Sequence, residues 1–138
     1  MGWSLDTRGG GVSFLEPIGG VMKSVAHAAR GIRLALSSQR NFRLHSIIAG
    51  AVVVAGIVVR FGRVEWILLI VTISFVMMAE LLNTALEYLL NLLEAHYHPV
   101  ARTVKDVAAG AVLLAVFGSV VVGLLLFWPR LLSLVVPR

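Results

Sequence analysis

The sequence predicts an all-α membrane protein in which one amphipathic surface helix precedes three transmembrane helices. Three observations predict this fold class. Hydrophobic residues make up 59% of the 138 residues and charged residues only 14%, a balance outside the range of water-soluble domains. The charged residues are clustered, and they leave three long apolar segments between them. The chain contains no cysteine, which excludes disulfides and thiolate metal sites.

The chain is predicted to consist of a leader, residues 1–19, and a membrane domain, residues 20–138. The leader is rich in glycine and has no hydrophobic period, which indicates a flexible segment. Over residues 20–38, apolar residues recur at spacings of three and four while basic residues take other positions. This pattern is typical of an amphipathic helix lying on an anionic membrane surface; an ordinary soluble surface helix is the alternative. The apolar positions are Val21, Val25, Ala28, Ile32 and Ala35.

Three apolar segments follow and predict membrane spans over residues 44–61, 66–95 and 104–128. The first is short, but a flanking arginine such as Arg60 can extend its usable length by snorkelling. The second is uncharged up to Glu80, after which the helical pattern continues as a cytoplasmic extension. The third contains the longest stretch without a formal charge.

The basic residues predict how these spans are oriented. Eight lysines and arginines fall on the side of the leader and the second loop, and four fall on the opposite side. The positive-inside rule therefore predicts a cytoplasmic N-terminus. Since the net charge of +5 comes from residues that flank apolar segments, we expect no nucleic-acid partner. The larger group is Arg8, Lys23, Arg30, Arg33, Arg40, Arg43, Arg102 and Lys105.

Polar side chains on the second span form one stripe. At about 100° per residue, five of them fall within about 80° of one another. A carboxylate in hydrocarbon costs about 2.5–3.5 kcal/mol on insertion scales, so we interpret Glu80 as a functional residue for proton transfer or metal ligation. The alternative is a span that ends near Ala79 and continues as a solvated acidic extension, which is the interpretation we prefer for Glu94. The stripe consists of Glu80, Asn83, Glu87, Asn91 and Glu94.

The third span opens with a second polar pair, Lys105 and Asp106. A cation at the membrane level of a row of carboxylates indicates a phosphate site with a divalent metal, because Mg²⁺ often bridges carboxylates to nucleotide phosphates. Phosphoryl transfer needs charge neutralisation and a base for the attacking hydroxyl. A snorkelling lysine beside a helix-start aspartate is the alternative, and the spacing leaves both open. His96 and His98 are interpreted as loop residues rather than as a zinc pair.

Small residues recur at every fourth position of the third span, at Ala111, Ala115, Ser119 and Gly123. Such a seam lets helix backbones approach closely in a membrane. It predicts tight bundling without identifying the partner helix.

These residues resemble a known family. The segment AELLNTALEYLLNLLEAHYHPVARTVKDVAAGAVLL, residues 79–114, resembles the signature of the bacterial diacylglycerol kinase and undecaprenol kinase family, and RNFRLH, residues 40–45, resembles its entry into the first span. With Gly31–Arg33, the likeness covers about residues 23–129. It implies a homotrimeric lipid kinase of the bacterial inner membrane that uses ATP and Mg²⁺, with active sites between subunits at the cytoplasmic face.

The resemblance also implies roles for individual residues. Glu80 matches the catalytic base that takes the proton from the lipid hydroxyl, and Asn83 matches the residue that supports it. Glu87 matches a magnesium-binding glutamate that also contacts the nucleotide. The other implied nucleotide contacts are Lys105, Asp106, His96, Tyr97, His98, Gln39 and His27, with Gly20 at a further ATP-site position, and the implied lipid contacts are Glu80, Arg33, Arg43 and Ala109.

One residue departs from the pattern of the family. Gln39 stands where better-known members have a second magnesium-binding glutamate, and a glutamine offers only a neutral carbonyl oxygen to a hard cation. The consequence is an altered metal affinity, a substitute ligand such as Glu94, or reduced activity.

The lipid substrate and two alternative functions stay open. The RNFR-x-H entry and the KDVAAGAV stretch look more like the undecaprenol kinase branch than the diacylglycerol kinase branch. The first alternative to a kinase is a small ion-conducting or proton-relay subunit that uses the Glu80 stripe as an ion path. The second is a non-catalytic assembly partner that has lost activity through Gln39.

Overall fold

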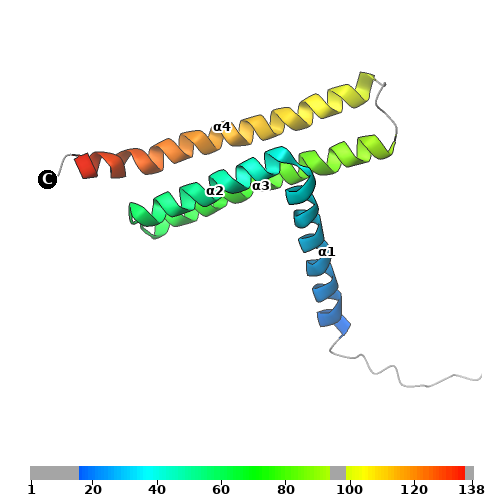
Figure 1. Cartoon of the computed structure of the whole chain (residues 1–138), viewed down its shortest axis with the longest axis horizontal. Helices are drawn as coiled ribbons and strands as arrows, with labels where there is room; N and C mark the ends of the chain where they lie inside the picture. Colours follow the sequence, from blue (N-terminus) through cyan, green and yellow to red (C-terminus); the bar gives the residue numbers. More distant parts are fainter. Residues whose placement is uncertain (1–15, 94–98, 136–138) are drawn as a thin grey trace, which may run out of the picture. The chain divides into compact units, whose positions relative to one another are not determined.

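The computed structural model describes residues 16–93 and 99–135, all of them helical or in short connections, and the described residues contain no strand (Figure 1). Three of its helices are long and apolar enough to cross a membrane. The predicted all-α fold class with three spans is therefore confirmed. The helices are α1, Glu16–Ser38; α2, Arg40–Val58; α3, Arg63–Leu92; and α4, Pro99–Val135.

The helices begin and end at other residues than the hydropathy pattern predicted. α1 begins at Glu16, so the last residues of the predicted leader are helical. α2 begins at Arg40, ahead of the apolar segment, and α4 continues through Pro129 to Val135. Hydropathy marks where a helix meets lipid, whereas helical hydrogen bonding continues into charged flanks and tolerates a proline in a membrane helix.

The chain divides into two units, residues 1–33 and 34–138, and each is described by itself. In the first unit, Nη2 of Arg30 lies 2.8 Å from Nδ1 of His27, one turn earlier on α1. The side chains of Val21, Val25 and Ile32 on the same helix are exposed. The position of this helix on the membrane surface stays a prediction.

In the second unit, α2 packs against α3, and α3 packs against α4. A short turn joins α2 to α3, and in it Arg60 adopts a left-handed conformation with a φ of 55°, which is uncommon outside glycine. Next to this turn, the ring of Phe61 lies 5.9 Å from that of Trp66 and 4.8 Å from that of Phe127, measured between centroids. A Cβ on Gly56 would lie 3.0 Å from Cδ2 of Phe61, so this end of the bundle is closely packed.

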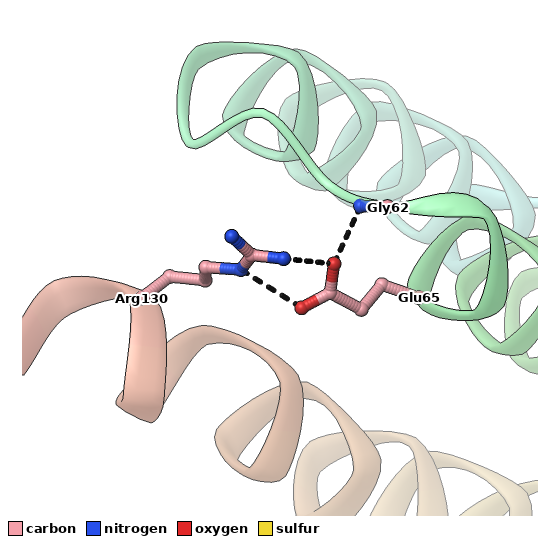
Figure 2. Close-up of polar contacts among 3 residues, drawn as sticks. All are labelled: Gly62, Glu65 and Arg130. Carbon is pink, nitrogen blue, oxygen red and sulfur yellow. Dashed lines mark hydrogen bonds and ion pairs between the residues drawn. The ribbon is translucent and has the colours of Figure 1, made fainter. Parts of the chain in front are cut away.

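An ion pair joins α3 to α4 at the same end. Nε of Arg130 donates to Oε1 of Glu65 at 2.9 Å, and Nη2 donates to Oε2 at 2.5 Å (Figure 2). The backbone N–H of Gly62 donates to the same Oε2 at 2.5 Å. This two-point geometry is the strong form of an arginine–carboxylate pair. It fixes the register of α4 against the start of α3.

Alanines form the buried face of α4 in its first half. Ala101, Ala108 and Ala115 recur every seven residues and are all buried, which lets the backbone of α4 approach α3 closely. The seam predicted over residues 111–123 named no partner helix and stays a prediction. Within one chain, Ala115 is buried, Ser119 and Gly123 are half-buried, and Ala111 is exposed.

Candidate active site

One stripe of α3 faces the interior of the bundle, and it changes character along the helix. Its first buried residues, Leu69 and Val76, are apolar, whereas the next two, Glu80 and Thr84, are polar. Glu80 is only 2% exposed, and Oγ1 of Thr84 has no hydrogen-bond partner among the described residues. Glu80 therefore points into the bundle rather than into lipid, and its surroundings contain unsatisfied polar atoms, which native interiors rarely retain without a reason.

The carboxylate of Glu80 is held by electrostatics alone within the described part of the chain. No hydrogen bond from residues 16–93 or 99–135 reaches it. Two charged or ionisable groups act on it, namely His45 on α2 and Glu87 two turns further along α3. His45 was not predicted as a site residue. Nearly the same number of residues separates His45 and Glu80 from Gly62 at the hairpin turn, and this symmetry is the signal that could have identified the pair.

The polar stripe continues beyond Glu80 through two long polar contacts. Nδ2 of Asn83 donates to Oε1 of Glu87 at 3.5 Å, and both residues are half-buried. Further along, Nζ of Lys105 on α4 donates to Oδ1 of Asn91 at 3.5 Å. The predicted cation and the predicted acidic stripe therefore lie on adjacent, packed helices. Both contacts are at the long limit for hydrogen bonds, so they are readily exchanged for contacts to a ligand.

Asp106 follows Lys105 and is exposed. Ala109, one of the predicted lipid contacts, is also exposed on α4. The structure therefore brings Lys105 to the stripe but leaves Asp106 and Ala109 on the outer surface of a single chain.

The junction of α1 and α2 lies next to the same stripe. Gln39 alone separates the two helices, in an extended conformation, and Nη1 of Arg43 donates to the carbonyls of Leu36 and Ser37 at 3.3 and 2.9 Å. The hydroxyl of Tyr88 donates to Oγ of Ser38 at 2.9 Å. Because Gln39 follows Ser38 and Glu87 precedes Tyr88, the backbones of the two predicted magnesium ligands lie beside one hydrogen-bonded pair.

The donor set at this place fits a magnesium ion only in part. Within residues 16–93 and 99–135, no group of three or more histidine, cysteine, aspartate or glutamate residues could hold a metal. Glu87 offers one carboxylate and Gln39 one neutral carbonyl oxygen. One or two protein ligands are nevertheless what Mg²⁺ uses when nucleotide phosphates and water complete its coordination, so the residues present fit a nucleotide-bound magnesium.

Several predicted site residues belong to the first unit or fall outside the described residues. His27 and Arg33 are exposed on α1 in the first unit, and so is Gly20. The predicted loop contacts His96, Tyr97 and His98, and the stripe residue Glu94, lie outside the described residues.

Two apolar grooves flank the polar stripe. Groove A, of about 370 Å³, lies among α2, α3 and α4, and its wall includes His45, Val76 and Met77. Groove B, of about 530 Å³, lies between α3 and α4 and includes Asn83. Glu80 is on the wall of neither groove. The arrangement therefore offers apolar surface for a lipid chain on both sides of a buried carboxylate.

Comparison with known proteins connects this geometry to a family. A model of the prokaryotic diacylglycerol kinases matches residues 26–127. An undecaprenol kinase of Bacillus subtilis strain 168 is 40% identical over 109 residues, covering 79% of this chain and 89% of the relative. A diacylglycerol kinase of Synechocystis is 42% identical over 117 residues, covering 84% and 67%, and one of Escherichia coli K12 is 27% identical over 108 residues, covering 78% and 88%. The matched region contains the whole polar stripe, His45 and Lys105.

Proposed function

The chain belongs to the prokaryotic diacylglycerol kinase family and is a membrane lipid kinase, and from this premise we propose that Glu80 is the general base of a phosphoryl transfer to a lipid hydroxyl. The acceptor is a membrane lipid alcohol, undecaprenol or diacylglycerol, and the donor is ATP. Both acceptors are proposed because one relative is named an undecaprenol kinase and another a diacylglycerol kinase. These two relatives are 40% and 42% identical to this chain, so the degree of identity favours neither acceptor.

The observation that carries this proposal is the burial of Glu80 without a hydrogen-bond donor. Glu80 as a residue is only 2% exposed, and no described residue donates a hydrogen bond to its carboxylate. A structural carboxylate in such a place would be expected to be paired. An unpaired one is available to accept a proton from a substrate that reaches it.

The proposed step is a direct phosphoryl transfer from ATP to the lipid. The lipid hydroxyl oxygen forms a bond to the γ-phosphorus of ATP while the bond between that phosphorus and the ADP oxygen breaks. The hydroxyl proton passes to the carboxylate of Glu80. Asn83, one turn along α3, positions the site, and Lys105 binds phosphate oxygens in place of its contact with Asn91. An amide at position 80 keeps the shape but does not accept the proton.

Magnesium is proposed to be held by Glu87 with a weaker contribution from Gln39. When bound, Mg²⁺ neutralises charge on the transferred phosphate. Asp106, His27 and the loop residues His96, Tyr97 and His98 are proposed as further nucleotide contacts. Arg33, Arg43 and Ala109 are proposed as lipid contacts, although Arg43 already serves the end of α1.

The active unit is proposed to be a homotrimer with sites between subunits, which accounts for the outward position of Asp106. In detergent, light scattering should give a protein mass three times the 14.9 kDa of one chain. A monomeric mass for fully active enzyme would contradict the trimer without affecting the kinase assignment.

The protein is proposed to lie in the bacterial inner membrane with its N-terminus in the cytoplasm. Because the chain has no cysteine, single cysteines can report the side of the membrane. An impermeant maleimide added to whole spheroplasts should label Arg63→Cys at the start of α3 and leave Ser24→Cys on α1 unlabelled. The reverse pattern would overturn the orientation.

The test of function is transfer of radiolabelled γ-phosphate to a panel of lipid alcohols in mixed micelles containing Mg²⁺. We expect incorporation into undecaprenol, diacylglycerol or both, and the faster acceptor identifies the branch. A shortened chain that lacks residues 1–15 should keep this activity if residues 20–138 form the kinase domain. Ion flux in liposomes without any phosphate transfer would instead favour the proton-relay alternative.

A further inference from the structure

We propose that His45 is a positioning residue for Glu80, and that it holds the buried carboxylate in line with a lipid hydroxyl bound in groove A. This inference rests on the proposed kinase function and adds to it a residue from the first membrane helix. Three features of the structure support it: the face of α2 that carries His45, the wall of groove A, and the charges around Glu80.

The inner face of α2 carries His45. Phe42 and Gly56 are buried, and Ala49 and Val52 between them are half-buried. These residues and His45 follow one another at spacings of three and four, which places them on one side of a helix. His45 is half-buried, and it is the only ionisable residue between Arg43 and the end of α2. The helix that packs on α3 therefore presents a single ionisable group to it, at the level of Glu80.

His45 also lines groove A beside the turn of α3 that leads to Glu80. It shares the wall with Val76 and Met77, the residues that precede Glu80 by one turn of α3. Glu80 itself does not line the groove. A hydroxyl bound in groove A can therefore contact the imidazole of His45 directly, next to the helical turn that carries the carboxylate.

The other hydroxyl groups on this wall are already engaged. Oγ1 of Thr72 donates to the carbonyl of Leu68 at 2.7 Å, and Oγ of Ser119 donates to the carbonyl of Val116 at 2.7 Å. No hydrogen bond of His45 occurs within the described residues. The imidazole is therefore a nitrogen group on this wall that can still bind a carboxylate or a hydroxyl, together with the indole N–H of Trp128. His45 is the one of the two that comes from α2.

The charges around Glu80 leave His45 as its partner. A buried carboxylate needs a nearby positive charge or donor, and His45 acts on it electrostatically, whereas Glu87 adds a like charge. Elsewhere on α2, Arg43 is bound to the carbonyls of Leu36 and Ser37, and on α4 Lys105 is bound to Asn91. Among the residues that the structure describes, the other charged groups in this half of the bundle are exposed, namely Arg40, Arg102 and Asp106.

A positioning role predicts a specific kinetic effect. An imidazole that orients the base and favours its charged form contributes in the transition state rather than to lipid affinity. Removing it should lower kcat and leave KM for the lipid nearly unchanged. A wall residue that only packs against the lipid chain would raise KM instead.

The test compares His45→Gln, His45→Lys and the neighbouring control Ser46→Ala in the full-length enzyme. For His45→Gln we expect kcat to fall about tenfold to a hundredfold, with KM for the lipid within about twofold. The acidic limb of its pH–rate profile should move to higher pH, because a buried carboxylate that loses a group favouring its charged form ionises less readily. His45→Lys places an ammonium group at the same position, so it should return the limb toward the wild-type position. Ser46→Ala should match the wild type, and circular dichroism on heating should show all three folded.

Four results would overturn the inference while wild-type transfer remains intact. Two concern the kinetics of His45→Gln: an unchanged kcat and pH profile, or a raised KM for the lipid with an unchanged kcat. The third is an acidic limb of the pH–rate profile that His45→Lys does not restore. The fourth is a loss of rate in His45→Gln that follows a loss of folded protein. Absence of phosphate transfer by the wild type to every lipid alcohol tested would instead defeat the proposed function, so the two failures are distinguishable.

Discussion

Two glutamates on the same helix, Glu65 and Glu80, lie in opposite surroundings. Glu65 accepts three hydrogen bonds, two from Arg130 and one from the backbone of Gly62 (Figure 2). Glu80, about 22 Å further along α3 at 1.5 Å per residue, is more deeply buried and accepts none from the described residues. Burial without partners is the costly arrangement, and burial with partners is the stable one. The comparison shows that Glu65 is held as part of the scaffold, and it supports the proposal that Glu80 takes part in the chemistry.

The surroundings of Glu65 and Glu80 also differ in how closely their side chains pack and in how short their polar contacts are. Near Glu65, the rings of Phe61, Trp66 and Phe127 pack together and the polar contacts are short. Beyond Glu80 on the same stripe, the Asn83–Glu87 and Lys105–Asn91 contacts are 3.5 Å long. A rigid end and an adaptable end on one helix allow the adaptable end to exchange its contacts for substrate without loss of the fold.

The largest effect outside the base itself is expected at the adaptable end, in Lys105→Gln. Loss of a cation that binds transferring phosphate should lower kcat/KM for ATP about 10²-fold, with little change in unfolding temperature. Steady-state kinetics with varied ATP measure this. Arg102→Gln, one turn earlier on α4 and exposed, is the matched control, and equal losses in both variants would assign the effect to overall charge rather than to a phosphate site.

The rigid end should respond through stability, most strongly in Gly56→Ala. The new Cβ would lie 3.0 Å from Cδ2 of Phe61 and 3.3 Å from Cη2 of Trp66, and overpacking of this kind costs about 1–3 kcal/mol. Thermal unfolding in detergent measures the effect. Gly50→Ala, on the same helix with nothing within 4 Å of its Cβ, should leave the transition in place; a similar loss there would show that helix α2 tolerates no added methyl group.

A smaller loss of stability is expected for Arg130→Gln. It removes the ion pair between α3 and α4 but leaves Glu65 its bond to Gly62, so the unfolding temperature should fall by a few degrees while kcat stays within about twofold of wild type. The same heating and transfer assays report both quantities. A large loss of activity with an unchanged unfolding temperature would show that Arg130 contributes to catalysis, and it would contradict the assignment of the Glu65–Arg130 pair to the scaffold.

The smallest effect is expected for Gln39→Glu. A second carboxylate beside Glu87 should lower the Mg²⁺ concentration for half-maximal rate several-fold, because hard cations prefer charged oxygen ligands. Titration of the rate with Mg²⁺ measures it. A variant and wild type that are both inactive would favour the non-catalytic alternative.

The sequence predicted those features that depend on local pattern. Hydropathy identified three spans, and the 3.6-residue period placed Glu80, Asn83 and Glu87 on one stripe of α3. It did not predict which residues the stripe meets. The neighbours His45, Lys105 and Arg130 come from other helices, and their approach depends on helix rotation and register, which are set by side-chain packing across the whole bundle.

The alanine face of α4 illustrates the same point. A spacing of four over Ala111 and Ala115 was visible in the sequence, but the buried repeat has a period of seven and begins at Ala101. Both patterns exist in the chain, and only contact with α3 selects between them. Helix starts were missed for a related reason, since helical hydrogen bonding begins in the charged flanks before the apolar composition does.

The most direct test of the contrast between the two glutamates is single-turnover phosphate transfer by Glu80→Gln and Glu65→Gln, prepared and assayed together with thermal unfolding. We predict that Glu80→Gln loses about 10²–10⁴-fold in rate with an unchanged or higher unfolding temperature, and that Glu65→Gln unfolds at a lower temperature but transfers phosphate at nearly the wild-type rate. Near-wild-type transfer by a folded Glu80→Gln variant would contradict the assignment of the base.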